Sequence, residues 1–228
     1  MLKLPLPKGL AAVAPSILSA DQLNLGLAVQ KAAQGGADWL HIDIMDGHFV
    51  PNLSFGPATV ACIDKTAALA QDVHLMVERP ADFTGPFTKA GASSLTLHIE
   101  SEGDLKQLLA QIRQSGLAAG LSIKPDTAPA EILPYIDLLD LVLVMTVYPG
   151  FGGQGFLQNG AAQIAGVRDI IKKSGRQIWL EVDGGINEET AAAAARAGAD
   201  AFVAGNAVFN APDTALAIAR IRRAAANF

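Results

Sequence analysis

The chain has 228 residues, a formal net charge of -5, and a composition that is 50% hydrophobic and 17% charged. This composition supplies enough apolar side chain for a sizeable core and is atypical of disorder. The acidic balance argues against nucleic acid as a partner, because Lys and Arg make most contacts to phosphate backbones. Cys62 is the only cysteine, which excludes an internal disulfide and fits a reducing compartment. No apolar run approaches the ~20 residues of a membrane span, so we expect a cytoplasmic protein without membrane contact.

Short apolar runs recur along the chain and are too short to be helices. LVLVMTV, from Leu141 to Val147, is apolar throughout, which is typical of a strand buried on both faces. Eight runs of this kind predict eight strands, near Ala11, Trp39, Val73, Leu95, Leu117, Leu141, Ile178 and Ala201.

Helix-like stretches lie between these runs. Asp21 begins one that continues to Gly35, and Glu102 precedes the amphipathic sequence DLKQLLAQIRQ. Asn187 can cap EETAAAAARAG, which ends before Gly198. Shorter spacers, such as Lys124 to Pro134, are predicted to be ordinary loops.

Repeated alternation of strand and helix predicts an α/β protein. Eight units favour a closed (β/α)₈ barrel, whereas an open doubly wound sheet, the alternative, more often has five to seven strands. No linker or change in composition divides the chain, so we expect residues 1–228 to form a single barrel domain.

Polar residues interrupt three of the predicted strands. His41 and Asp43 are two positions apart in WLHIDIMDG, so their side chains point to the same face. The third strand adds His74, and the seventh ends at Asp183. This donor set favours Zn²⁺ or Fe²⁺ over Mg²⁺ or Ca²⁺, which prefer oxygen ligands. A hydrogen-bonded His-Asp pair in the core is the alternative for any one of them, but four such groups near strand ends favour a metal or catalytic site.

Glycines follow the last three predicted strands, in YPGFGGQGF, DGGI and AGNAVF. They allow backbone N–H groups to approach an anion closely, and barrels often bind phosphate with their last strand-to-helix loops. A sugar phosphate is the expected ligand. The segment from Gly150 to Gly155 also has the length of a lid over the ligand.

Several other side chains fall at or near predicted strand ends. Met45, Met76 and Met145 form either an apolar patch facing the substrate or part of the core. Ser16 either donates a hydrogen bond to a sugar oxygen or begins a helix. His98 and Lys124 have no evident sequence partner and are expected to be structural or solvated, although Lys124 raises a Schiff-base aldolase alternative.

The motifs APSILSAD, HIDIMDGHFVPNLSFGP, DVHLMVERP, MTVYPGFGGQGF and EVDGGI together resemble the ribulose-phosphate 3-epimerase family, from about Ala14 to Phe209. The resemblance implies a (β/α)₈ TIM barrel of the ribulose-phosphate-binding type. It also implies interconversion of D-ribulose 5-phosphate and D-xylulose 5-phosphate in the pentose phosphate pathway, with one divalent metal ion. Zn²⁺ or Fe²⁺ is expected, with Co²⁺ or Mn²⁺ as further possibilities.

The resemblance also assigns roles to residues. It implies that His41, Asp43, His74 and Asp183 bind the metal, that Asp43 also accepts the proton and that Asp183 also donates it. The residues expected to contact substrate are Ser16, Met45, His74, Met76, Met145, Gly150, Phe151, Gly152, Gly153, Asp183, Gly184, Gly185, Gly205 and Asn206. Tyr148 stands where many relatives have Asn, and Asn206 where most have Ser. The expected partners are a small sugar phosphate and further copies of the chain in a homo-oligomer.

Rival functions fall into three classes, and the residues of the second predicted strand favour proton abstraction over the chemistries of the first class. Related barrels that decarboxylate orotidine phosphate or condense formaldehyde with a pentulose phosphate carry Asp-x-Lys-x-x-Asp on the second strand, where this chain has His41, Asp43 and Asp46. An epimerase for a six-carbon ketose phosphate such as D-allulose 6-phosphate would need the same metal and both aspartates. A non-catalytic barrel that binds sugar phosphate would need neither metal nor paired carboxylates.

Overall fold

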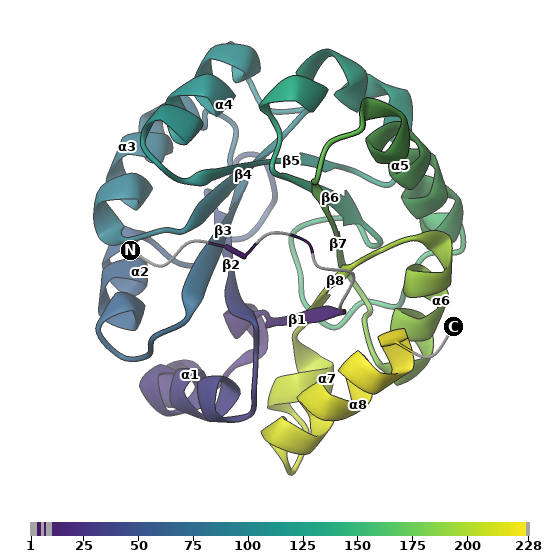
Figure 1. Ribbon diagram of the computed structural model, residues 1–228. Coiled ribbons are helices and arrows are strands. Elements are labelled where there is room, and N and C mark those ends of the chain that lie inside the picture. The colour runs from purple at the N-terminus through teal and green to yellow at the C-terminus, as the bar shows by residue number, and fades with distance from the viewer. Residues whose placement is uncertain (1–3, 6, 8–10, 227–228) are drawn as a thin grey trace.

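The computed structural model describes residues 4–5, 7 and 11–226. Eight parallel strands are hydrogen-bonded in the order β1-β8-β7-β6-β5-β4-β3-β2, and a parallel bridge between Ser16 and His41 brings the first and second strands together. Figure 1 shows the strands as a ring surrounded by helices. The predicted (β/α)₈ barrel is therefore confirmed, with strands β1 Ala12–Pro15, β2 Trp39–Met45, β3 Ala70–Met76, β4 Ser94–His98, β5 Ala118–Ile123, β6 Leu141–Met145, β7 Trp179–Asp183 and β8 Ala201–Ala204.

Both faces of the strands are buried, as the apolar runs predict. In β2, Leu40, Ile42 and Ile44 belong to the apolar core shared with the helices. Side chains alternate along a strand, so Trp39, His41, Asp43 and Met45 all face the barrel interior. This alternation places the polar residues of β2 inside the barrel, with Met45 nearest its C-terminal mouth.

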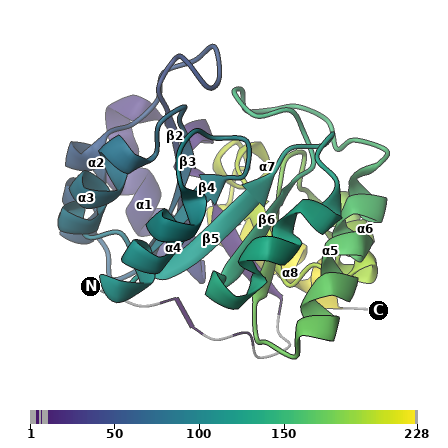
Figure 2. The same ribbon diagram turned by 90° about the horizontal axis from the view of Figure 1, so that it is seen from above.

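Helices cover the outside of the barrel, and long loops extend from one of its ends (Figure 2). The predicted helices after Asp104 and Asn187 are confirmed: both cap residues accept hydrogen bonds from the first turn, and Gly198 follows the second helix in a left-handed conformation. The stretch after Asp21 begins as a short 3₁₀ turn, η2 Gln22–Asn24, before it becomes α1. The α-helices are α1 Leu25–Gln34, α2 Pro57–Asp64, α3 Ala81–Ala90, α4 Leu105–Gln114, α5 Gly160–Ser174, α6 Glu188–Ala197, α7 Asn206–Phe209 and α8 Thr214–Ala226.

The connection between β5 and β6 differs from the prediction. Lys124 to Pro134 was expected to be a loop, but the 3₁₀ helix η3 Pro129–Leu138 occupies its second half and buries Ile132 in the core. A proline inside an α-helix removes a hydrogen bond and clashes with the carbonyl four residues earlier. Pro134 therefore favours the tighter 3₁₀ geometry at a position where the other units carry an α-helix.

The N-terminal end of the barrel is closed by apolar side chains. Trp39 and Trp179 pack edge to face with ring centroids 5.1 Å apart, and the indole of Trp179 donates a hydrogen bond of 2.6 Å to the carbonyl of Pro5. Leu4 packs against the same cluster. The opposite, C-terminal end is thus the end at which a ligand can enter. Within the described part of the chain, none of the helices has the length and apolar character needed to cross a bilayer.

Candidate metal centre and active site

The four polar residues predicted from the strands converge in one cluster. The register of β2 and β3 places Asp43 directly beside His74. Asp43 Oδ1 lies 3.3 Å from His41 Nε2 and 3.2 Å from His74 Nδ1, and the two ring nitrogens are 3.4 Å apart. Asp183, from β7, joins the cluster, in which one candidate ligand atom from each of the four residues lies within 4.8 Å of the others.

The spacing of these atoms suits a metal ion. Tetrahedral coordination with bonds of about 2.0 to 2.1 Å requires ligand atoms about 3.3 to 3.4 Å apart, and the three measured separations agree with that value. Two imidazole nitrogens with carboxylate oxygens form a donor set typical of zinc and of other transition metals. The buried group is therefore able to hold a divalent metal.

A second layer of buried polar groups orients His41 from below. His41 Nδ1 lies 2.7 Å from Asp72 Oδ2, and the other oxygen of Asp72 accepts a hydrogen bond of 2.5 Å from Ser94 Oγ. Glu181 accepts a hydrogen bond from the indole of Trp39, and its second oxygen lies 3.9 Å from His41 Nδ1. Burial and the neighbouring Asp72 carboxylate raise the pKa of Glu181 well above its usual range.

Asp72 and Glu181 were not identified from the sequence. Each lies two positions before a predicted ligand on the same strand face, in DVH and EVD. That spacing was an available signal, because an acidic residue inside a buried strand requires a partner.

His74 is held by a different set of residues. Its Nε2 atom lies 2.9 Å from His98 Nε2, and His98 Nδ1 lies 3.0 Å from Glu100 Oε2. His98, expected to be structural or solvated, is fully buried and contacts a candidate ligand. Burial lowers the pKa of His98 to about 4.

The two candidate catalytic carboxyls have opposite pKa shifts. Burial alone would raise the pKa of Asp43, but the charge of His41 and its hydrogen bond to Asp43 outweigh it and hold that pKa well below its usual range. Ser16 Oγ donates a further hydrogen bond of 2.5 Å to Asp43 Oδ2. Burial and the charge of Asp43 raise the pKa of Asp183 to about 7. Opposed shifts in paired carboxyls are typical of acid and base partners.

A cavity of about 500 Å³ opens above the cluster at the C-terminal mouth. His41 and His74 lie beneath it and are fully buried, so His74, which was expected to contact substrate, does not line the cavity. Ser16 both borders the cavity and caps the 3₁₀ helix η1 Ile17–Ser19. The predicted residues that line the cavity are Ser16, Asp43, Met45, Met76, Met145, Gly150, Phe151, Gly152, Gly153, Asp183, Gly184, Gly185, Gly205 and Asn206.

Glycine is required where the β6–α5 loop, residues 146–159, packs against the end of β7. Gly185 has a φ of +66°, and a Cβ atom on it would lie 2.3 Å from the backbone nitrogen of Phe156. Gly153, in the same loop, has a φ of +78°, and its Cβ would lie 2.7 Å from the side-chain amide of Asn206. These close approaches fix the loop over the cavity.

The same loop is fastened at several points. Asn52 Nδ2 donates to the carbonyl of Gly150 at 2.8 Å, and Gln154 Nε2 donates to the carbonyls of Tyr148 and Phe151. The Tyr148 hydroxyl donates to Asp126, so this side chain is held outside the cavity. Tyr148, the departure from the family pattern, is therefore not among the residues that line the cavity.

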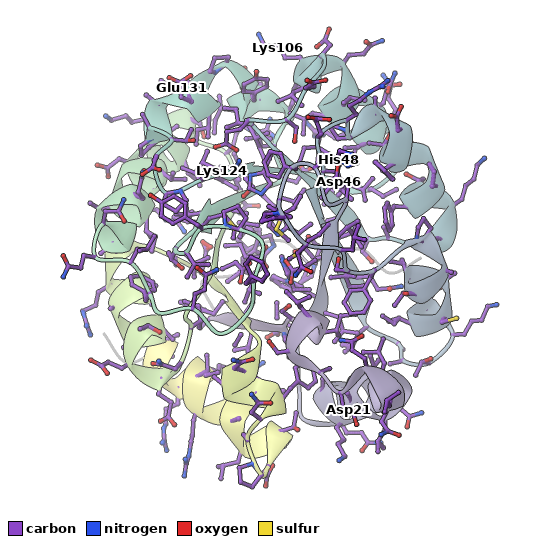
Figure 3. The ribbon with its side chains drawn as sticks, turned by 180° about the vertical axis from the view of Figure 1, so that it is seen from behind. Asp21, Asp46, His48, Lys106, Lys124 and Glu131 are labelled. Carbon is purple, nitrogen blue, oxygen red and sulfur yellow. The ribbon has the colours of Figure 1, made fainter. Side chains whose placement is uncertain are left out.

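Lys124 lies near the mouth but outside the cavity lining. Figure 3 shows Lys124, Asp46 and His48 toward the middle of this face, with Asp21, Lys106 and Glu131 at its edge. Lys124 Nζ lies 3.8 Å from the centroid of the Phe49 ring, a cation–π contact. This position gives no support to a Schiff-base role.

A parallel barrel whose mouth holds imidazoles, paired carboxyls and a glycine-lined cavity has the architecture of a (β/α)₈-barrel enzyme with a metal-binding centre. A profile described as "Ribulose-phosphate 3 epimerase family" matches residues 12–209. The chain therefore belongs to the ribulose-phosphate 3-epimerase family, whose members are isomerases.

Curated relatives agree with this assignment over almost the whole chain. A ribulose-phosphate 3-epimerase of Mycobacterium tuberculosis is 45% identical over 216 residues, which covers 93% of this chain and 92% of the relative. The Bacillus subtilis protein of the same name is 44% identical over 212 residues, covering 92% and 97%.

Solved structures resemble the fold. A chain of M. tuberculosis tryptophan synthase superposes with a TM-score of 0.68 at 16% identity, covering 96% of this chain and 93% of that one. KGPDC of Streptococcus mutans gives 0.69 at 12% identity, covering 95% and 97%. At these identities the likeness concerns the barrel alone.

Proposed function

We propose that this protein is a ribulose-phosphate 3-epimerase that interconverts D-ribulose 5-phosphate and D-xylulose 5-phosphate in the pentose phosphate pathway. The observation that carries the proposal is the pair Asp43 and Asp183, which share one cavity beside the His-carboxylate cluster and have oppositely shifted pKa values. Inverting C3 of a 2-ketose requires removal of the hydrogen next to the carbonyl and its return from the opposite face. Two carboxyls lining one cavity meet that requirement.

The protonation states favour defined roles for the two residues. Asp43 is ionised at neutral pH and accepts the proton, whereas Asp183, with a pKa of about 7, can hold a proton to donate. In the reverse direction the roles exchange. The lowered pKa makes Asp43 a weak base in water, so exclusion of water by the β6–α5 loop must assist it.

His41, His74, Asp43 and Asp183 would hold one divalent cation, for which we propose Zn²⁺ or Fe²⁺, with Co²⁺ or Mn²⁺ as substitutes. When bound, the cation supplies Lewis-acid stabilisation of negative charge on the substrate oxygens. Ser16 keeps the Asp43 carboxylate in place from the cavity side.

The glycine loops are proposed to hold the phosphate. Gly184, Gly185 and Gly205 line the cavity beside the β6–α5 loop, in the region where barrels commonly bind phosphate through backbone amides. Met45, Met76 and Met145 add an apolar surface to the cavity for contact with the sugar carbons. We further propose that the chain is one catalytic domain that acts in the cytoplasm as a homo-oligomer.

Hydrogen exchange with deuterated solvent tests the two-base mechanism. Asp43→Asn and Asp183→Asn should each lose epimerisation, while each retains exchange at C3 from only one of the two epimers. Asp169→Asn, which removes an exposed carboxylate on α5, is the matched control and should behave like the unchanged protein. Zinc content is measured for each variant, because both aspartates are also candidate ligands. Full epimerisation by either active-site variant would refute the mechanism.

The same preparations decide the substrate. A coupled assay compares D-ribulose 5-phosphate with D-allulose 6-phosphate, and a higher kcat/KM for the five-carbon sugar is expected. A preference for the six-carbon sugar would keep the mechanism and reassign the substrate.

A further inference from the structure

A chain of three side chains, two buried imidazoles and a half-buried carboxylate, extends from the metal centre to the loop that follows β4. His74 contacts His98 through their Nε2 atoms at 2.9 Å, and His98 Nδ1 contacts Glu100 Oε2 at 3.0 Å. Both imidazoles are fully buried. Phe49 packs on His98, with ring centroids 4.7 Å apart, and Lys124 Nζ lies 3.8 Å from the centroid of the Phe49 ring.

The hydrogen-bonding capacity of each group fixes where the protons lie. Glu100 Oε1 accepts hydrogen bonds from the backbone N–H of Lys124, at 2.9 Å, and from Thr127 Oγ1. An ionised carboxylate only accepts, so Oε2 requires a proton on His98 Nδ1. A neutral imidazole carries one proton, and the complete burial of His98 favours this neutral form over the charged one. His98 Nε2 is then an acceptor and requires a proton on His74 Nε2.

This assignment matters because His74 has a competing partner. His74 Nδ1 lies 3.2 Å from Asp43 Oδ1, a carboxylate that would attract the ring proton to Nδ1. A proton on Nδ1 blocks that atom as a ligand, and Nδ1 is the atom that lies beside Asp43 and His41 Nε2 in the cluster. Glu100 opposes protonation of His74 Nδ1. It requires a proton on His98 Nδ1, so His98 Nε2 is an acceptor and holds the His74 proton on Nε2.

We propose that Glu100, acting through His98, is a positioning residue that keeps the His74 proton on Nε2 and so presents His74 Nδ1 to the metal before the ion arrives. The inference rests on the metal site of the proposed function. It gives His74 an outer partner equivalent to the one that Asp72 provides for His41, and such partners commonly change metal affinity by about 10- to 100-fold.

Glu100→Gln reverses the direction of the hydrogen bonds from residue 100 through His98 to His74, with almost no change in the shape of the side chain. The backbone N–H of Lys124 is a fixed donor, so the amide oxygen must face it and the NH₂ group must face His98 Nδ1. His98 then carries its proton on Nε2, donates to His74 Nε2, and places the His74 proton on Nδ1. Glu102→Gln is the matched control, because it makes the same chemical change on an exposed side chain two residues away.

Two measurements read the result without substrate. Long-range ¹H–¹⁵N NMR of the metal-free protein should place the proton of His74 on Nε2 and that of His98 on Nδ1 in the unchanged chain and in Glu102→Gln, with both tautomers exchanged in Glu100→Gln. Competition against a chelator should show Zn²⁺ affinity about 10- to 100-fold lower for Glu100→Gln alone.

The inference is overturned if His74 carries its proton on Nδ1 in the unchanged metal-free protein, a result that needs no variant to fold. It is also overturned if Glu100→Gln folds and keeps both the original tautomers and the original Zn²⁺ affinity. A protein that shows the expected tautomers and binds Zn²⁺ but does not epimerise would refute the proposed function and leave this inference standing.

Discussion

Replacing Gly185 by alanine should move the β6–α5 loop away from the cavity that it covers. Gly185 has a φ of +66°, where an L-residue costs about 1 to 2 kcal/mol. The new Cβ would also lie 2.3 Å from Phe156 N and 2.9 Å from the carbonyl carbon of Gly155, which are backbone atoms that cannot rotate away. Overpacking of this kind adds about 1 to 3 kcal/mol, so the expected loss of unfolding free energy is about 2 to 5 kcal/mol.

Gly175→Ala is the control that separates the backbone strain of a positive φ from the steric clash of the new Cβ atom. Gly175 has nearly the same φ, +67°, but a Cβ atom there would meet nothing within 4 Å. It should therefore cost only the strain, about 1 to 2 kcal/mol, and leave KM unchanged. Gly185→Ala should also raise KM for ribulose 5-phosphate, because the loop must move away from the cavity. Urea unfolding and steady-state kinetics of both variants provide the comparison, and equal losses of stability with an unchanged KM would refute the reasoning.

Two further outcomes follow from charges at the site. Asp43 and Asp72 raise the pKa of His41 against the opposing effect of burial, and Asp183 has a pKa of about 7, so Zn²⁺ must displace protons from both at low pH. Zinc affinity should fall more steeply as pH drops through 7, with more protons released near pH 6 than near pH 8, because Asp183 then also holds a proton that Zn²⁺ must displace. Calorimetry in buffers of different ionisation enthalpy measures this, and a pH-independent affinity would contradict it. Lys124→Ala should keep epimerase activity, and the unchanged protein should form no borohydride-trapped adduct at Lys124, because Nζ lies over Phe49 and outside the cavity lining. Loss of turnover in the variant, or an adduct in the unchanged protein, would support Schiff-base chemistry.

The fold was predictable because each strand is buried on both faces and therefore appears in the sequence as an apolar run. The stretch from Leu141 to Val147 is the clearest example, although β6 itself ends at Met145. The connection through η3 was not predictable, because Pro129 and Pro134 indicate a break in α-helix but not the 3₁₀ geometry that replaces it.

The residues of the candidate centre were recognisable for the opposite reason. His41 and Asp43 are polar side chains in an otherwise apolar strand, and the strand period places them on one face. Their outer partners depend on how neighbouring strands are aligned. Asp72 meets His41 only because the β2–β3 register sets those two residues opposite each other, and the sequence of either strand does not contain that register.

His98 was noted at a strand end and expected to be structural or solvated, but its contacts could not be predicted, on similar grounds. Its partner His74 lies on the adjacent strand, and its own two-residue spacing to Glu100 resembles an ordinary strand end. An imidazole at the end of a buried strand, followed two residues later by a carboxylate, is the pattern that would have indicated its role.

The candidate metal ligands and their buried partners lie mainly on strands, whereas much of the cavity rim is built from loops. Loop residues tolerate replacement far better than buried strand residues do. Selection can therefore alter which ketose phosphate is accepted, through loop positions such as Phe151, while the proton chemistry is inherited unchanged. For the protein engineer, the strands form a catalytic core that can be kept while the loops are evolved to recognise longer sugars.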